Sequence, residues 1–263
     1  MSKHIDFLKR NLQNNISHIF SQKQASLFHY IADFLEFFIQ PLILYFIYEI
    51  SRGFPEWSMY EMFLLIATAR ISMGIAGITS FGIFFSNAWK IEAGYFHQVL
   101  IKPFKTAYYM ILESINLHWI MDLMVGIIFF AYSIIMLELQ ITLIGFFSFL
   151  LIMISSCLCY FGIIGLIMNF LFTHPRSNNI IDLLFTMTNF SKYPLNIFPD
   201  YIKFGLTFIF PIALTSYYPA SYFLGKSTDF ISLAIFIMIG IVFAAIGTFA
   251  LNNGIKKHIS FGG

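Results

Sequence analysis

Apolar residues fall along the chain in long stretches that short polar segments separate. These stretches cover residues 31–50, 60–85, 117–137, 142–172 and 230–251, and the polar segments include 86–114 and 173–179. A helix needs about 20 apolar residues to cross the hydrocarbon core of a bilayer. The pattern therefore predicts an all-α polytopic membrane protein with one spanning helix in each apolar stretch.

The N-terminal segment has a different periodicity. Its apolar residues recur every three or four positions, with basic and amide side chains between them; they are Ile5, Leu8, Leu12, Ile16, Ile19 and Phe20. This spacing is typical of a helix that lies in the membrane interface. We predict such an amphipathic interfacial helix over residues 1–29, with a helix packed on a soluble partner as the alternative.

Residues 189–225 are apolar enough to enter a membrane, but prolines interrupt them. A proline inside a helix costs about 3 kcal/mol, and lipid cannot replace the lost hydrogen bond. Two arrangements are open. Either residues 180–194 cross and residues 200–225 dip back as re-entrant outer helices, or residues 201–225 form one span. The prolines favour re-entrant helices within 195–229, which would leave Thr215, Ser216 and Ser221 reachable from outside.

Composition and charge give the class and the orientation. Hydrophobic residues make up 59% of the 263 residues, charged residues only 11%, and mean hydropathy is +0.78. A soluble domain carries about 25% charged residues, so this chain belongs in a lipid bilayer. A net charge of +2 gives no basis for a nucleic-acid partner. Lys and Arg flank both termini and fill 86–114, whereas the loops around Arg52 and Glu138 carry Arg52 alone. The positive-inside rule then places both termini in the cytoplasm, with an even number of crossings, about six.

Few residues stand out as carriers of chemistry. Arg70 lies about 15 Å into the second span, where an arginine costs at least ~2.5–3.5 kcal/mol. It either binds an anionic substrate group in a cavity or bridges helices through carbonyl groups or a carboxylate such as Asp122, and we favour the bridge. Asp33, Glu36 and Gln40 share one face of the first span. Cys157 and Cys159 are interpreted as buried thiols. No catalytic residue, metal site or cofactor is expected in the chain, which lacks H-E-x-x-H and G-x-S-x-G patterns.

Three segments together resemble the ABC-2 type permeases. The order of prolines and glycine in "FSKYPLNIFPDYIKFGLTFIFPIALTSYYPASYFLG" is similar to the outer segment that precedes the last span in that family. The segment "WKIEAGYFHQVLIKPF" resembles its cytoplasmic coupling loop, and "GIKKHISFGG" resembles the tail of a bacterial subgroup formerly catalogued as a domain of unknown function. The resemblance covers nearly the whole chain.

The resemblance implies an ABC-2 type exporter fold of six transmembrane helices. The transmembrane domain would cover residues 30–254, with a coupling segment at 86–114 and a cytoplasmic tail at 255–263. It further implies a non-catalytic permease subunit of the bacterial cytoplasmic (inner) membrane, paired with a second copy or a homologous permease. Two copies of a separate ABC ATPase would hold ATP and Mg, and the chain itself has no G-x-x-x-x-G-K-[ST] loop.

The resemblance also implies site residues. Those expected to contact the ATPase, with Val99 as a further apolar anchor, are Glu92, Gly94, Tyr95, Phe96, Leu100, Lys102 and Pro103. Those expected to form the outer gate are Pro194, Pro199, Pro211, Tyr217, Tyr218 and Pro219. A plain solvated connector remains the alternative for 86–114. The rival functions are a secondary transporter or channel without an ATPase, in which internal repeats are common, and an intramembrane enzyme.

Overall fold

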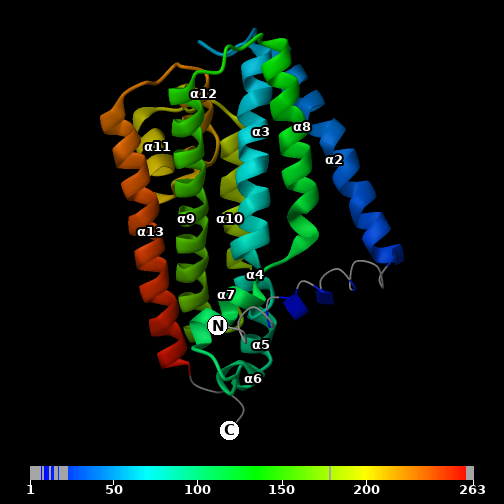
Figure 1. Ribbon diagram of the computed structural model, residues 1–263, viewed down its shortest axis with the longest axis vertical. Helices are drawn as coiled ribbons and strands as arrows, with labels where there is room; N and C mark the ends of the chain where they lie inside the picture. Colours follow the sequence, from blue (N-terminus) through cyan, green and yellow to red (C-terminus); the bar gives the residue numbers. More distant parts are fainter. Residues whose placement is uncertain are drawn as a thin grey trace.

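The computed structural model describes residues 7, 9–11, 13–14, 17, 23–177 and 179–258, and this part of the chain is helical without a strand (Figure 1). The α-helices are α2 (Lys23–Ile50), α3 (Met59–Ala76), α4 (Gly82–Phe85), α5 (Ala88–Glu92), α6 (His97–Leu100), α7 (Thr106–Glu113), α8 (Ile120–Met136), α9 (Leu143–Thr173), α10 (Ile180–Thr188), α11 (Asp200–Phe204), α12 (Tyr217–Phe223) and α13 (Phe230–Lys257). Short 3₁₀ or π turns join them, at η1 (Gly77–Phe81), η2 (Leu117–Trp119), η3 (Asn189–Lys192), η4 (Leu195–Ile197), η5 (Gly205–Ile209) and η6 (Ile212–Thr215).

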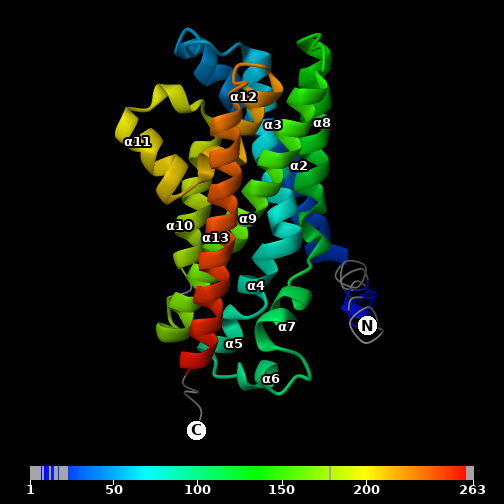
Figure 2. The same ribbon diagram turned by 60° about the vertical axis from the view of Figure 1, so that its left-hand side comes forward.

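The long helices lie side by side and run between two ends of the molecule (Figures 1 and 2). Among the described residues, four helical segments are long and apolar enough to cross a membrane: Met59–Glu92, Leu117–Met136, Leu143–Thr173 and Phe230–Lys257. α2 contributes a shorter apolar segment, Ile39–Ile50. α10 runs from the end where α9 finishes toward the other end, beside α9 (Figure 1). The apolar stretches predicted from the sequence therefore coincide with long helices.

N-terminal capping residues start two of these helices at the positions that hydropathy predicts. Ser58 starts α3 with a capping box: its backbone N–H donates to Glu61 Oε2 at 2.7 Å, and Glu61 N–H donates back to Ser58 Oγ. Asp229 starts α13 by accepting from the N–H groups of Ile231 and Ser232, and these hydrogen bonds hold its carboxyl pKa below the usual range.

The helices nearest the two chain ends extend past the predicted boundaries. Residues 23–29, predicted to belong to the interfacial helix, form the first turns of α2, and most of residues 1–22 lie outside the described residues. Phe7 packs against Phe104 and Tyr109, with ring centroids 5.7 and 5.3 Å apart. α13 continues to Lys257, so the first residues of the predicted tail 255–263 are helical, and residues 259–263 lie outside the described residues. Lys256 and Lys257 in the last turn of α13 suit the negative end of the helix dipole.

α9 and α13 pack against each other along their length through small residues. A Cβ on Gly247 would lie 2.5 Å from the Cα of Gly162, and one on Gly165 would lie 2.7 Å from the carbonyl carbon of Gly247. Gly74 in α3 and Gly126 in α8 make similarly close approaches to the opposing helix. Small residues let helix backbones approach in this way in a membrane. The close approaches divide the long helices into two tightly packed pairs, α3 with α8 and α9 with α13.

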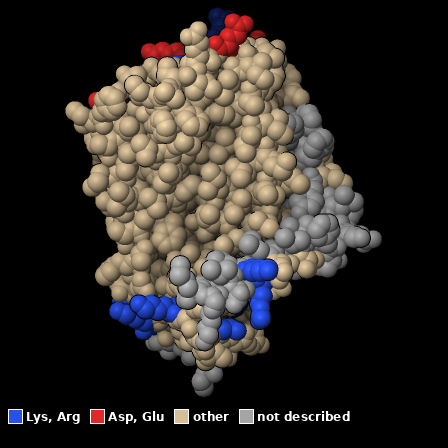
Figure 3. Space-filling model, in the orientation of Figure 1, with Lys and Arg blue, Asp and Glu red and all other residues tan. Residues whose placement is uncertain are grey.

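The two ends of the molecule carry opposite charge. Figure 3 shows Lys and Arg side chains at the end that holds α5–α7 and the end of α13, and Asp and Glu side chains at the opposite end. Exposed Lys102, Lys105 and Lys256 belong to the basic end by their place in the chain. The sequence analysis overlooked Lys226, which precedes α13 at the acidic end, where it forms a 2.9 Å ion pair with Glu61.

Residues 195–229 fold into short helical turns at the acidic end rather than into one continuous helix (Figure 2). The prolines act differently from one another. Pro211 separates η5 from η6. Pro219 breaks no helix, because it lies in the first turn of α12, where a missing N–H costs little. Thr215, Ser216 and Ser221 are buried, so the prediction that they are reachable from outside is wrong for this conformation.

Candidate functional site

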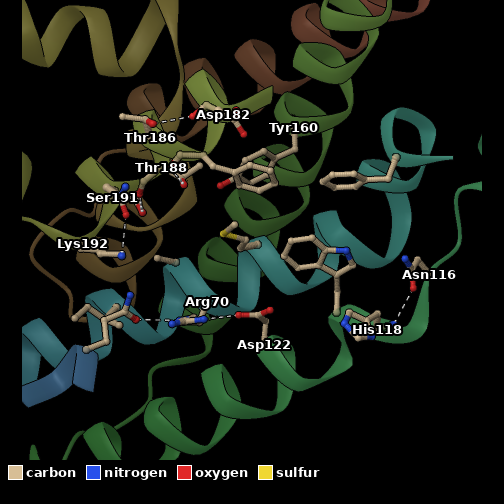
Figure 4. Close-up of a pocket in the computed structure, with 18 residues that line it drawn as sticks. Arg70, Asn116, His118, Asp122, Tyr160, Asp182, Thr186, Thr188, Ser191 and Lys192 are labelled. Atoms are coloured by element: carbon tan, nitrogen blue, oxygen red, sulfur yellow. Dashed lines mark hydrogen bonds and ion pairs between the residues drawn. The ribbon is translucent and has the colours of Figure 1, made fainter. Parts of the chain in front are cut away.

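A cavity of about 740 Å³ lies between the helices, and it is called the polar cavity because charged, amide and hydroxyl side chains line it beside apolar ones. One wall comes from α2, α3, η2 and α8, and the facing wall comes from α10 and η3 (Figure 4). The buried side chain of Tyr160 from α9 closes the back of the cavity. Cavities of this size hold small-molecule ligands in many proteins. Polar side chains at this depth mark substrate paths or structural bridges in membrane proteins.

The first wall carries a bridge between helices. Arg70 in α3 donates from Nη1 to Asp122 in α8 and from Nε to the amide oxygen of Gln40 in α2, the latter at 3.0 Å (Figure 4). The side chains of Arg70 and Asp122 are only 16% and 19% exposed, so the charges are largely shielded. The structure thus brings together the arginine and the carboxylate that the sequence analysis named. Both also line the cavity, so the bridge forms part of the site's surface.

The facing wall is a row of hydroxyl, amide and charged groups. Thr186 donates to Asp182 O at 2.7 Å and Ser191 donates to Thr188 O at 2.6 Å, while Lys192 donates to Asn189 Oδ1 at 2.9 Å (Figure 4). A hydroxyl that donates to its own helix still has lone pairs that accept hydrogen bonds. This wall can therefore offer acceptors, a carboxylate and an ammonium group to a ligand in the cavity.

The sequence analysis missed this second wall. It did not name Asp182, Ser191 or Lys192 among the candidate site residues. The side chains of Asp33 and Glu36, predicted to share a face with Gln40, lie outside the described side chains. The spacing of polar residues could have identified this wall. Asp182, Thr186 and Asn189 recur every three or four residues, as expected for one helix face.

The predicted coupling segment forms a knuckle at the basic end, made of α5, the turn at Gly94, α6 and the loop to α7 (Figure 2). Gly94 has a φ of +76°, which favours glycine, and no atom lies within 4 Å of where its Cβ would be. Apolar side chains point away from the protein here: Trp89, Tyr95 and Leu100 are 53%, 49% and 43% exposed, and Ile101 is 78% exposed. Glu92, Lys102 and Pro103 are exposed as well.

Phe96 and Val99, which the sequence analysis placed on the partner-facing side, are instead buried in the protein's own core. The Phe96 ring packs against Phe172 at the end of α9 and His258 after α13, with centroid separations of 4.9 and 5.1 Å. Burial lowers the pKa of His258, which favours its neutral form in this cluster. Phe96 therefore joins the knuckle to the ends of α9 and α13.

The residues predicted for the outer gate lie in the short turns between α10 and α13. Tyr217 and Tyr218 pack on a small apolar cluster of Leu195, Leu206 and Ala213. Two residues near this cluster in the sequence contact the loop before α3. Asn196 donates to Pro55 O at 3.0 Å, and the Lys226 ammonium lies 4.3 Å from the ring centre of Trp57. Pro194 and Pro211 are buried, whereas Pro199 is exposed at the start of α11.

Comparison with known families decides the identity of this helical arrangement. A family model described as ABC-2 family transporter protein matches residues 34–262. The chain belongs to the ABC-2 transporter family. It is therefore a multi-pass membrane protein and a permease component of an ABC transporter, in a family whose members normally work with an ABC ATPase. Comparisons with curated proteins and with solved structures gave no match.

Proposed function

We propose that this ABC-2 family protein is the permease subunit of an exporter that a separate ATPase drives. Two permease chains, identical or homologous, would pair around the substrate path, and two ATPase copies would bind ATP and Mg²⁺. The observation that carries the proposal is the knuckle at the basic end, with exposed Trp89, Tyr95, Leu100 and Ile101. Exposed aromatic and aliphatic anchors that neighbour Lys102 and Lys105 suit an apolar cleft with an acidic rim.

The contacts of the knuckle suggest how ATPase movement would reach the membrane. The ring of Phe96 touches Phe172 and His258, so displacement of α6 displaces the ends of α9 and α13. The close glycine contacts between α9 and α13 make that pair move as one body. The polar cavity lies between the α3–α8 pair and α10, with Tyr160 of α9 at its back. Rocking of the α9–α13 pair would therefore change the shape of the cavity.

For the coupling prediction, Ile101→Asp should abolish the stimulation of the partner's ATP hydrolysis by the permease. A carboxylate in place of this exposed side chain would face desolvation in an apolar cleft, and removal of one central anchor costs about 2 kcal/mol or more of binding. ATP hydrolysis by the complex in lipid nanodiscs measures the effect. Ile141→Asp is the matched control, because Ile141 is 53% exposed in the loop between α8 and α9, at the other end. Equal stimulation of the two variants would show that the ATPase binds elsewhere.

For the topology prediction, the basic end should face the cytoplasm, with about six crossings in which α10 and η3 make a short fifth one. A cysteine at exposed Lys102 should stay unlabelled by an impermeant thiol reagent in intact cells and react after permeabilisation. A cysteine at exposed Glu138, in the turn between α8 and α9, should react in intact cells. Cys157 and Cys159 are replaced by alanine in both variants. Labelling of the Lys102 position from outside would invert the orientation.

The outer gate remains part of the proposal in a revised form. The segment 195–229 would close the path at the outer end through packing of Tyr217 and Tyr218. The contacts of Asn196 with Pro55 and of Lys226 with Trp57 and Glu61 would hold the segment against the start of α3 in the closed form. Because Thr215, Ser216 and Ser221 are buried, opening of the gate would expose them only when the segment moves.

A further inference from the structure

The polar cavity borders a second cavity, whose lining is mostly apolar. This annex has a volume of about 310 Å³ and shares Gln40, Ile66, Asn189 and Lys192 with the polar cavity. The remaining lining of the annex is one row of α2 side chains and one aromatic residue: Ile39, Ile43, Leu44, Ile47 and Tyr193. A polar chamber joined to an apolar annex matches a ligand that has a polar head and an apolar chain.

The charged side chains that line the polar cavity limit the charge that the ligand's polar head can carry. They include the cations Arg70 and Lys192 and the carboxylates Asp122 and Asp182, and these formal charges cancel. Arg70 and Asp122 lie on one wall, whereas Asp182 and Lys192 lie on the other (Figure 4). A head of a single charge sign would meet a like charge on either wall, at a cost that low surrounding polarity increases. A head with both charges can pair with both signs.

The lining and the volume of the annex limit the apolar chain that a ligand can place there. Ile39, Ile43 and Ile47 recur at intervals of four residues, so they form one stripe along α2. At about 30 Å³ for each water-sized group, the annex holds roughly ten such groups. This volume suits one short hydrocarbon chain and is too small for two long ones. Gln40 and Lys192 stand at the boundary, where the head would meet the chain.

We propose that the joined cavities bind a single-chain amphiphile with a zwitterionic head. The head lies between the Arg70–Asp122 wall and the Asp182–Lys192 wall, and the chain lies along Ile39, Ile43 and Ile47. This inference rests on the proposed function, since it names the substrate class that the permease would carry. Polar side chains that face lipid cost free energy. The exposed polar groups on α10, such as Asp182 and Thr186, are therefore better explained by a substrate path or a bound ligand.

Photo-crosslinking tests this site directly. The full-length permease is placed in phosphatidylcholine nanodiscs with lauroyl-lysophosphatidylethanolamine that carries a diazirine at the chain end. Mass spectrometry then maps the labelled residues, with no nucleotide and no ATPase present. We expect labelling to concentrate on Ile39, Ile43, Ile47 and Tyr193, and to fall about tenfold in Ile43→Trp, which fills the annex. Ile128→Trp is the matched control: Ile128 in α8 is 55% exposed and Ile43 is 51% exposed, but only Ile43 lines the annex.

Competition with unlabelled probes of the same chain length tests the head. The unlabelled zwitterion should compete at least several-fold better than lauroyl-lysophosphatidylglycerol, dodecylamine or dodecyl maltoside, which carry anionic, cationic and uncharged heads. Lys192→Gln should remove that preference while the protein stays monodisperse. Equal or better competition by one of the other heads overturns the zwitterion assignment. Labelling spread over exposed residues of α8 and α13, without competition, overturns the site altogether.

These outcomes stay separate from those of the proposed function. The crosslinking needs only the permease, whereas the coupling test needs the ATPase and reads its hydrolysis. Concentrated labelling together with equal stimulation by the Ile101→Asp and Ile141→Asp variants would keep the ligand site and reject coupling through the knuckle. Diffuse labelling together with selective loss of stimulation in Ile101→Asp would keep the coupling and reject the ligand site.

Discussion

Replacement of Gly247 with leucine should prevent α9 and α13 from packing, and the protein should fail to accumulate in a monodisperse form. A Cβ at this position would lie 2.5 Å from both Cα and the carbonyl oxygen of Gly162. Carbon atoms pack at about 3.5–4.0 Å, so the helices would have to separate by roughly 1–1.5 Å. Both obstructing atoms belong to the backbone, which a change of side-chain rotamer cannot move.

Alanine at the same position gives the graded version of this experiment. Alanine is the better helix former by about 1 kcal/mol, which alone would stabilise α13. Overpacking of a tight interface costs about 1–3 kcal/mol and sometimes more. We expect the steric cost to prevail, because the α9–α13 interface is close along much of its length. Gly247→Ala should therefore lower the melting temperature of the purified protein, and Gly247→Leu should lower it further or abolish folding.

Ala245→Leu is the control, because Ala245 lies in the same helix with an exposed side chain. It adds the same kind of apolar bulk on the other side of α13 and should leave the melting temperature nearly unchanged. Thermal unfolding followed by size-exclusion chromatography in detergent measures all three variants. If Gly247→Leu matched Ala245→Leu in yield and melting temperature, the close approach of α9 and α13 would be wrong.

The sequence predicted the long helices well because one physical quantity governs them. A run such as 142–172 has a single stable arrangement in lipid, a helix, and α9 (Leu143–Thr173) follows it within a residue at each end. The same argument predicts α8 (Ile120–Met136), with η2 as its first turn. It fails at the ends of α2 and α13, where polar residues extend the helices past the apolar run.

Short amphipathic segments were harder, because a short sequence motif does not reveal which face packs on the protein. Tyr95 and Phe96 are neighbours of similar hydrophobicity, yet Tyr95 is about half exposed and Phe96 is buried. The difference comes from the ends of α9 and α13, which lie far away in the sequence. Proline was ambiguous for a related reason: Pro211 and Pro219 look alike, but Pro219 falls in the first turn of a helix.

Some residues of the polar cavity could likewise be predicted from the sequence, and others could not. Arg70 was conspicuous because charge deep in a span is costly, and Asp122 could be named as a partner from its type alone. Lys192 and Ser191 were not recognised, since the depth of the segment 180–194 depends on how residues 195–229 fold. Only the three-dimensional arrangement places η3 opposite α3 (Figure 4).

The second large effect is expected at the bridge between Arg70 and Asp122. Asp122→Leu should destabilise the protein by about 3–5 kcal/mol, because it leaves a largely buried guanidinium without its carboxylate partner. Gln40 also accepts from Arg70, at 3.0 Å, but a neutral amide does not compensate a charge. Arg70→Leu should have a comparable cost through the carboxylate that it leaves behind.

The double variant Arg70→Leu/Asp122→Leu separates the structural role of the bridge from its role in the site. Replacement of a buried ion pair by apolar residues of similar volume is often neutral or stabilising, so the melting temperature should recover most of the loss. A double variant with a melting temperature below that of either single variant would show that the two charges do not act as a pair. Nothing in this step depends on a substrate or on the ATPase.

Function should not recover with stability. The pair lines the cavity, so the double variant removes one of the two walls that would hold a zwitterionic head. We expect a stable protein that keeps basal stimulation of its ATPase and loses at least tenfold in labelling by the diazirine amphiphile. The exchanged variant Arg70→Asp/Asp122→Arg is the control, since it keeps both charges on the same wall and should retain part of that labelling. Full labelling of the apolar double variant would make Arg70 and Asp122 a bridge between α3 and α8 and nothing more.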